Sequence, residues 1–169
     1  MSVPASPQLV PGRECGSCMM CCKVPPIKAL KKPPGKWCPH AVFGKGCGIY
    51  ADRPAVCSAF YCEWMRNPSL GPEWKPDKAK LVVSFPDIWV DPSVPNAWRE
   101  PPYFTRIKQW AVEGPERGEF VLVRIGPRLI VVLPDREVDL GHVDPEAQLT
   151  VSRERGPTGV RYDVEVRPR

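Results

Sequence analysis

Histidine is scarce in this chain, because His40 and His142 are the only two among 169 residues. A chain so poor in imidazole has few side chains that can act as general bases near neutral pH. It also lacks the GxGxxG, phosphate-loop, HExxH and GxSxG patterns. These motifs would indicate a nucleotide-dependent enzyme, a kinase or a hydrolase. The sequence therefore indicates no catalytic activity, and whether the protein is an enzyme stays open.

Long apolar runs are missing as well. No stretch approaches the roughly 20 apolar residues that a membrane-spanning helix requires. Residues 1–7, MSVPASP, show neither the basic segment nor the apolar segment of a secretory signal. We therefore expect a cytoplasmic protein with no membrane partner. In that compartment thiols stay reduced, and closely spaced cysteines favour metal or redox chemistry.

Cysteine is absent after position 62, and all eight cysteines lie in one stretch of the sequence. They are Cys15, Cys18, Cys21, Cys22, Cys38, Cys47, Cys57 and Cys62. Two cysteines separated by two residues can meet across one tight turn, and Gly16-Ser17 is a turn-competent spacer. A tetrahedral zinc ion or an iron–sulfur cluster needs four converging thiolates. Eight thiols can therefore form two four-sulfur sites, or one site with additional bridging or structural thiols.

The doubled Cys21-Cys22 leaves two geometries open. In an extended segment, neighbouring side chains point to opposite faces and would serve different metals. In a helix, positions 15, 18, 21 and 22 would share one face, about 120° wide. Both geometries are compatible with one multinuclear site or with two adjacent mononuclear sites.

A disulfide framework is the main alternative to a metal site. Eight cysteines in a small secreted domain allow 105 pairings. Because we expect a reducing compartment, we favour a zinc or iron site over disulfides, an iron–sulfur cluster included.

The cysteine pattern resembles the CxxCxxCC zinc- or iron-chelating domain family, the YkgJ-type proteins. The resemblance rests on the four cysteines of residues 15–22, on Cys38-Pro39-His40, and on the block from Gly46 to Tyr50. It continues through Arg53-Pro54-x-x-Cys57 and Phe60-Tyr61-Cys62, and so covers about a third of the chain. It implies metal binding through the eight cysteines, in a family whose activity is largely undefined. Residues after about 70 resemble no known family.

Acidic residues are absent between Glu14 and Asp52, whereas five lysines lie between Cys22 and Cys38. These lysines could form a solvated loop, lower the pKa of nearby thiols, or contact nucleic acid. Nucleic acid is disfavoured because no aromatic residue is interleaved with them for base stacking. The formal charge of +5 falls to about +1 when eight thiolates bind two dications.

His40 follows Cys38 closely and could replace a cysteine, because zinc accepts imidazole readily. With eight thiols available, we predict that His40 is not a ligand. His142, between Gly141 and Val143, is predicted to be a loop residue.

The later sequence is β-rich. Strands are predicted over 81–85 and 88–90, a helix over 103–112, and hairpins over 119–133 and 148–166. Asp52 is predicted to cap a helix that carries Cys57 and ends near Cys62. We predict an α+β fold in which a small cysteine-rich module with short helices joins an antiparallel sheet. The predicted parts are a flexible lead-in (1–13), the metal-binding module (14–66), a linker (67–79) and a β-rich module (80–169).

Two function classes follow from these features. The first is a metal-binding protein that holds zinc or iron and, if the metal is iron, serves in electron transfer, redox sensing or as an oxidoreductase accessory. The second is a zinc-scaffolded interaction module for a protein or RNA partner.

Overall fold

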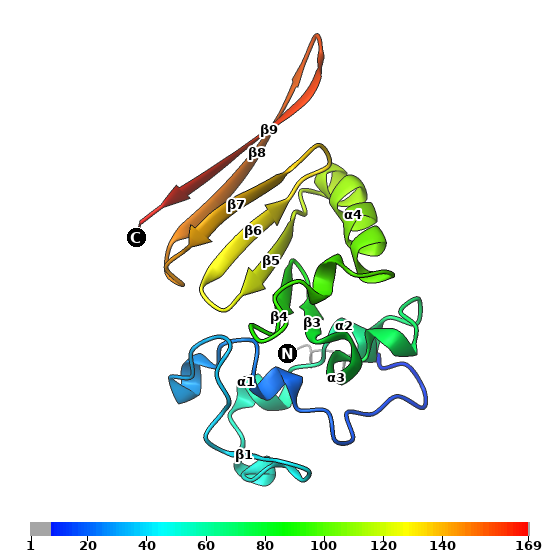
Figure 1. The fold of residues 1–169 in the computed structure, drawn as a ribbon, viewed down its shortest axis with the longest axis vertical. Helices are drawn as coiled ribbons and strands as arrows, with labels where there is room; N and C mark the ends of the chain where they lie inside the picture. The colour runs from blue at the N-terminus through cyan, green and yellow to red at the C-terminus, as the bar shows by residue number, and fades with distance from the viewer. Residues whose placement is uncertain (1–7, 169) are drawn as a thin grey trace, which may run out of the picture.

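The structure, a computed structural model, describes residues 8–168 and is built around a five-stranded sheet with strand order β3-β4-β5-β6-β7 (Figure 1). The strands of this sheet are β3 (Leu81–Ser84), β4 (Asp87–Val90), β5 (Val121–Ile125), β6 (Arg128–Val132) and β7 (Glu137–His142). A long separate hairpin follows, formed by β8 (Gln148–Gly156) and β9 (Gly159–Arg167). The longest helix of the described residues is α4 (Tyr103–Glu113).

All other elements are short. They are η1 (Met20–Cys22), η2 (Lys28–Leu30), β1 (Ala41–Val42), β2 (Gly46–Cys47), η3 (Tyr50–Asp52), α1 (Ala55–Ser58), α2 (Glu63–Arg66), η4 (Pro72–Trp74), α3 (Pro76–Ala79), η5 (Ala97–Arg99) and η6 (Gly114–Arg117). The predicted α+β class is confirmed at this level. The predicted strands, the helix at 103–112 and both hairpins are found in the structure, and β7 is a strand that the sequence did not indicate.

One strand pair departs from the expected antiparallel arrangement. β4 and β5 run parallel, with Ile88 opposite Val123, whereas the other neighbouring pairs of the sheet are antiparallel. Parallel neighbours need a crossover connection that returns the chain to the same end of the sheet. Residues 91–120 supply it, and they contain α4.

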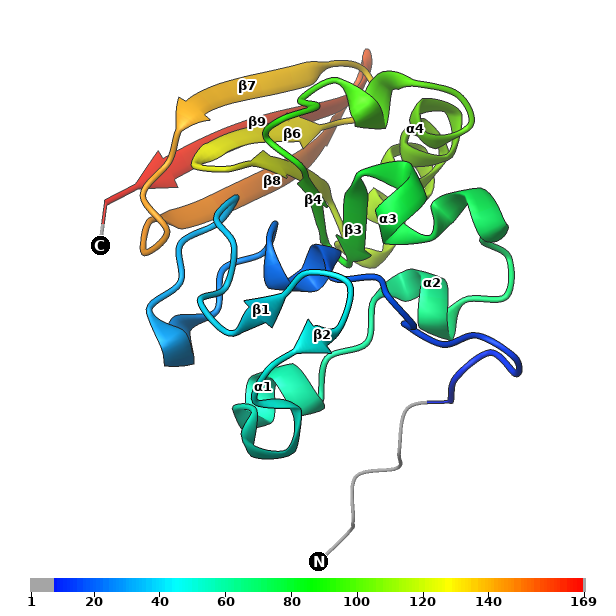
Figure 2. The same ribbon diagram turned by 60° about the horizontal axis from the view of Figure 1, so that its bottom comes forward.

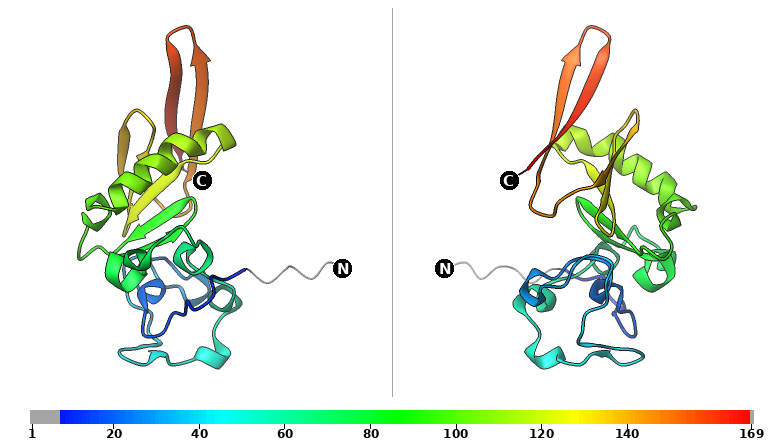
Figure 3. Two further views of the ribbon diagram at one scale, coloured as in Figure 1. Left: turned by 90° about the vertical axis from the view of Figure 1, so that its right-hand side faces the viewer. Right: turned by 60° about the vertical axis from the view of Figure 1, so that its left-hand side comes forward.

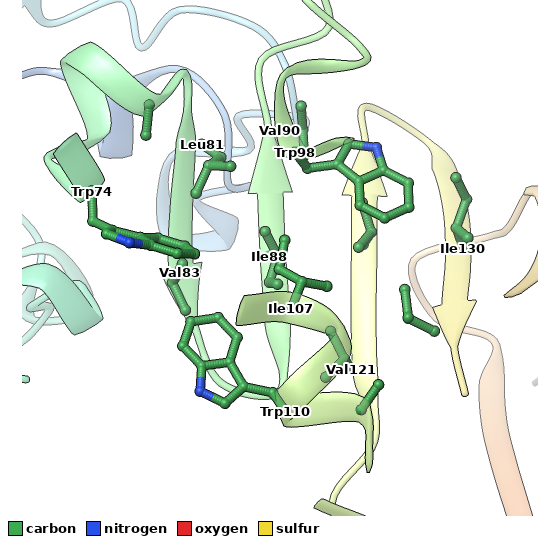
Figure 4. Close-up of a cluster of buried hydrophobic side chains, with 14 of the residues drawn as sticks. Trp74, Leu81, Val83, Ile88, Val90, Trp98, Ile107, Trp110, Val121 and Ile130 are labelled. Atoms are coloured by element: carbon green, nitrogen blue, oxygen red, sulfur yellow. The ribbon is translucent and has the colours of Figure 1, made fainter. Parts of the chain in front are cut away.

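The crossover covers one face of the sheet and encloses the main core. Alternate residues of β3 to β6, such as Val83 and Ile88, face Ile107 and Trp110 of α4. Figure 4 shows the tryptophans of this core lying over the strands, and Trp98 is fully buried. Figure 3 shows α4 on one side of the sheet and the β8–β9 hairpin on the other.

The opposite face of the sheet is divided between two regions of the chain. Leu122, Leu129 and Val131 pack against the β8–β9 hairpin, whose Tyr162 is buried among them. Val82 packs instead against Met20, Met65 and their neighbours in the cysteine-rich stretch. The cysteine-rich stretch therefore lies beside the hairpin and under β3 and β4 (Figure 2).

The segment predicted as a linker, 67–79, is packed into the main core. It forms η4 and α3, and Leu70, Trp74 and Ala79 are buried there. Pro72 and Pro76 stand at helix starts, where proline's missing N–H carries no cost.

Part of the predicted lead-in is anchored as well. The Val10 amide donates to the Met65 carbonyl at 2.8 Å. The Arg13 guanidinium donates to the carbonyls of Trp64 and Asn67, the latter at 2.9 Å. Residues 1–7 of the predicted lead-in lie outside the described residues.

The prediction that a helix starts at Asp52 is wrong. Asp52 ends η3, and α1 begins at Ala55 with Pro54 at the N-cap and no side-chain cap. The helix stops at Ser58, and a new turn, α2, starts after Cys62. This break places Cys62 and Met65 in the core under Val82, which an unbroken amphipathic pattern did not predict.

Candidate metal centre

The first four cysteines lie on a turn followed by a short 3-10 helix. The Cys18 amide donates to the Cys15 carbonyl at 2.9 Å, which closes a turn over Gly16-Ser17. Met19 and Met20 are buried, and η1 then carries Cys21 and Cys22. A turn thus leads into a short helix, and one continuous helix through residues 15–22 is not formed.

Four thiols surround one small cavity of about 40 Å³. We call them the first thiol group, and its members are Cys15, Cys18, Cys21 and Cys62. Trp64, Met65 and Val82 form part of the apolar wall, and Lys75 adds a cation. The group joins the turn of 15–18 to Cys62, which lies 44 residues after Cys18 and directly precedes α2. A cavity of this size can hold a single ion or one water molecule rather than an organic ligand.

Burial and backbone amides shift the pKa values of two of these thiols in opposite directions. Burial raises the pKa of Cys18, and the backbone of Met20 and Asp77 partly offsets this. Burial likewise raises the pKa of Cys62, while the amides of Met65 and Trp64, in the first turn of α2, favour its thiolate. Nearby thiolates of the group raise both pKa values further. A metal cation would remove this mutual repulsion.

The other four cysteines gather on the loops that follow. We call Cys22, Cys38, Cys47 and Cys57 the second thiol group. The Cys38 amide donates to the Cys22 carbonyl at 2.8 Å, which places these two side by side. The small β1–β2 hairpin pairs Cys47 with Ala41, so that Cys47 returns toward Cys38.

Cys57, on α1, completes the second thiol group. Burial raises the pKa of Cys57, and the negative charges of Cys22, Cys38 and Cys47 raise it further. Arg53 acts in the opposite direction on the same thiol. Its guanidinium also lies over the Tyr50 ring, with 3.7 Å from Cζ to the ring centroid.

The two groups adjoin at the Cys21-Cys22 step. A hydrogen bond to Cys22 raises the pKa of Cys21, and burial adds to this. The same bond lowers the pKa of Cys22 to about 7, and Lys32 lowers it as well, although burial opposes both. Opposite pKa shifts of this kind are typical of two adjoining thiols that share one proton.

The lysines between Cys22 and Cys38 do not act alike. Lys32 is buried, and its Nζ donates to the carbonyls of Lys23, Pro25 and Pro33 at 2.7–3.0 Å. Burial lowers the pKa of Lys32, whereas the thiolates of Cys38, Cys22 and Cys21 raise it. Lys23 forms a mostly buried ion pair with Asp91, at 2.7 Å. Lys28, Lys31 and Lys36 are exposed.

Two buried nitrogen donors beside the thiols have no partner in the described part of the chain. They are Nε1 of Trp64, which lines the first cavity, and Nε of Arg53, which neighbours Cys57. Unpaired buried donors are rare in folded proteins, and each one indicates a missing acceptor. A thiolate sulfur is such an acceptor, because metal-bound thiolates take N–H donors in their outer shell.

Neither histidine lines the first cavity. His40 is half-buried, and its carbonyl accepts from the Gly48 amide at 2.7 Å. His142 is exposed at the end of β7, paired with Arg128, rather than in a loop.

All eight cysteines are free thiols. Across residues 8–168, no three Cys, His, Asp or Glu side chains are arranged closely enough to hold a metal ion as they stand. The donor set suits zinc or iron in its chemistry, and the thiols of each group would have to draw inward to bind one. In the same residues, no helix is long and apolar enough to cross a membrane.

Comparison with known proteins adds no relative. The chain matches no protein-family model, no curated protein and no solved structure. The resemblance to the YkgJ-type family therefore stays a prediction that rests on the cysteine spacing.

Several residues of this site were not indicated by the sequence. Lys75 and Trp64 line the first cavity, and both come from segments assigned to a linker or a helix face. In the sequence, Lys32 does not differ from the other four lysines between Cys22 and Cys38, but in the structure it is buried. Only tertiary packing distinguishes these residues from their neighbours.

Proposed function

We propose that this protein binds zinc or iron through its eight cysteines, in a compartment where thiols remain reduced. The observation that carries the proposal is the lack of burial over residues 39–61. None of these residues, all of which the structure describes, is buried, although Cys47 and Cys57 lie among them. Ordering a segment costs about 1–2 kcal/mol per residue in backbone entropy. Apolar burial does not offset that cost here, whereas metal–thiolate bonds would.

The cations beside the thiols support an anionic metal–thiolate centre. Lys32 faces Cys22 and Cys38, and Lys75 lines the first cavity. Four thiolates around one dication leave a charge of about −2, which a nearby ammonium group partly balances. If the metal is iron, electron transfer, redox sensing or an accessory role to an oxidoreductase follows as the use.

Metal content decides this proposal. Protein purified without air and without chelators should contain more than one zinc or iron per chain by elemental analysis. An iron–sulfur protein would be brown and absorb visible light, whereas a zinc protein would be colourless. Four native disulfides in the mass spectrum, with no metal, would contradict the proposal.

A second candidate function is a zinc-scaffolded module that binds a protein partner. It is favoured by exposed large apolar side chains on the loops of the second thiol group, among them Phe43 at 70% and Tyr50 at 68% exposure. Such side chains often mark interaction surfaces. In this case the purified protein would carry colourless metal, and Phe43→Ser would weaken partner capture while leaving the metal content unchanged.

A further inference from the structure

The arrangement of the eight thiols goes beyond metal binding as such. The first thiol group surrounds one cavity, with Cys62 brought to the turn of 15–18 by the break before α2. The second group is assembled by different contacts, namely the Cys38–Cys22 backbone bond, the β1–β2 hairpin and α1. No cysteine belongs to both groups.

We propose that the chain holds two separate four-thiolate sites, one in each thiol group, and that each takes one thiophilic metal centre. The proposal rests on the proposed function and adds which cysteines share a metal. The ligands then interleave along the sequence, because Cys62 closes the first site after the chain has passed through the second. Cys21 and Cys22 are consecutive residues that serve different sites.

Each site has its own supporting cation and its own unpaired donor. Lys75 and Trp64 Nε1 accompany the first group, and Lys32 and Arg53 Nε accompany the second. Cations and unpaired donors thus lie beside both groups, as two separate sites require.

The environments of the two sites differ. The first adjoins the cluster of Met20, Met65 and Val82 under the sheet. The second lies on loops that bury nothing between residues 39 and 61. We therefore expect the second site to lose its metal to a chelator first.

Paired substitutions test the assignment. Cys15→Ser changes an exposed ligand of the first group and Cys47→Ser a half-buried ligand of the second. If wild-type protein holds two equivalents of metal, each single variant should hold one. Cys15→Ser/Cys62→Ser should still hold one, because both changes fall in the same group, whereas Cys15→Ser/Cys47→Ser should hold none. Ser58→Ala, next to a ligand, is the matched control and should hold two.

Alkylation of the wild-type protein during stepwise chelation gives a test that needs no variant. Bound thiolates resist alkylation, so thiols should become reactive in two sets of four, with the second group first. If all eight thiols become open to alkylation in one step, the two-site assignment is overturned. It is also overturned if the thiols that react together come from both groups. Wild-type protein that contains no metal and alkylates fully would overturn the proposed function itself.

Discussion

The cysteine-rich region (14–66) and the sheet region (80–168) are held together by different means. In the sheet region, side chains from β3 to β6 and from α4 are buried on both faces of the sheet. In the cysteine-rich region, five of the eight exposed large hydrophobic side chains of the described residues lie between positions 37 and 56. Burying one large apolar side chain contributes about 1.5–3 kcal/mol. The sheet region therefore has a large core of its own, whereas the cysteine-rich region has only a smaller cluster around Met20 and Met65 and, under the proposed function, relies on metal–thiolate bonds as well.

The largest effect expected from this difference follows metal removal. A strong chelator under reducing conditions should unfold the cysteine-rich region while the sheet region stays folded. Structural zinc contributes about 10–16 kcal/mol of apparent binding free energy in small domains. Hydrogen exchange followed by residue should therefore show protection lost around Cys15 to Cys62 first.

Two outcomes of that experiment would break the comparison. Equal loss of protection in both regions would mean that they form one cooperative unit. Unchanged protection near the cysteines would mean that the metal is not structural.

The next effect belongs to the sheet region. Trp98 is fully buried in the main core, and Trp98→Ala should lower the free energy of unfolding by about 3–5 kcal/mol. Phe43→Ala is the control, because Phe43 is 70% exposed and its removal should change stability by less than about 0.5 kcal/mol. Urea unfolding measures both, and folded Trp98→Ala should keep its full metal content. A larger loss for Phe43→Ala than for Trp98→Ala would contradict the comparison.

A smaller effect is expected at the joint between the regions. Lys23 follows Cys22, and Asp91 follows β4, so their ion pair ties the two regions together. The side chains are only 16% and 6% exposed, and Asp91 also accepts from the Ser93 amide at 2.9 Å. Asp91→Asn removes the charge and leaves Lys23 buried without its partner, which should cost about 1–3 kcal/mol. Ser93→Ala, which keeps the ion pair, should cost less.

The pH dependence of this joint has a definite sign. Burial raises the pKa of Asp91, but the bonds from Lys23 and Ser93 outweigh it and hold the pKa below its ordinary value. The stabilisation is therefore fully present above the unfolded pKa of about 4. It is lost as the pH falls through the lower pKa of the folded state. The stability difference between wild type and Asp91→Asn should shrink in that acidic window, and a constant difference would contradict the assignment.

The sequence predicted the sheet region far better than the cysteine-rich one. Alternation in Val160, Tyr162 and Val164 predicts a half-buried strand, and Tyr162 is indeed buried in β9. Helical spacing of Ile107, Trp110 and Ala111 predicts α4, where all three are buried. Local patterns succeed here because burial on a regular element repeats at the period of that element.

The same reasoning failed where packing interrupts a regular element. The apolar spacing from Val56 to Trp64 suggests one helix, yet the chain breaks at residues 59–62 so that Cys62 reaches the first cavity. Pro68 and Gly71 suggest a linker, yet Leu70 and Trp74 are buried beside them. The grouping of the thiols was open for the same reason, because it depends on contacts between segments distant in the chain.

The smallest expected effect sharpens the all-thiolate assignment. His40 lies two residues after Cys38, where it could replace a cysteine as a zinc ligand. Each thiol group already contains four cysteines, so His40→Ala should leave the metal content unchanged, whereas Cys38→Ser should lose one equivalent. The His40 carbonyl accepts from the Gly48 amide, a backbone contact that alanine retains. Elemental analysis of both variants beside the wild type measures the difference. Loss of a full equivalent from His40→Ala would show that one site contains an imidazole, and that one of the eight cysteines is not a ligand.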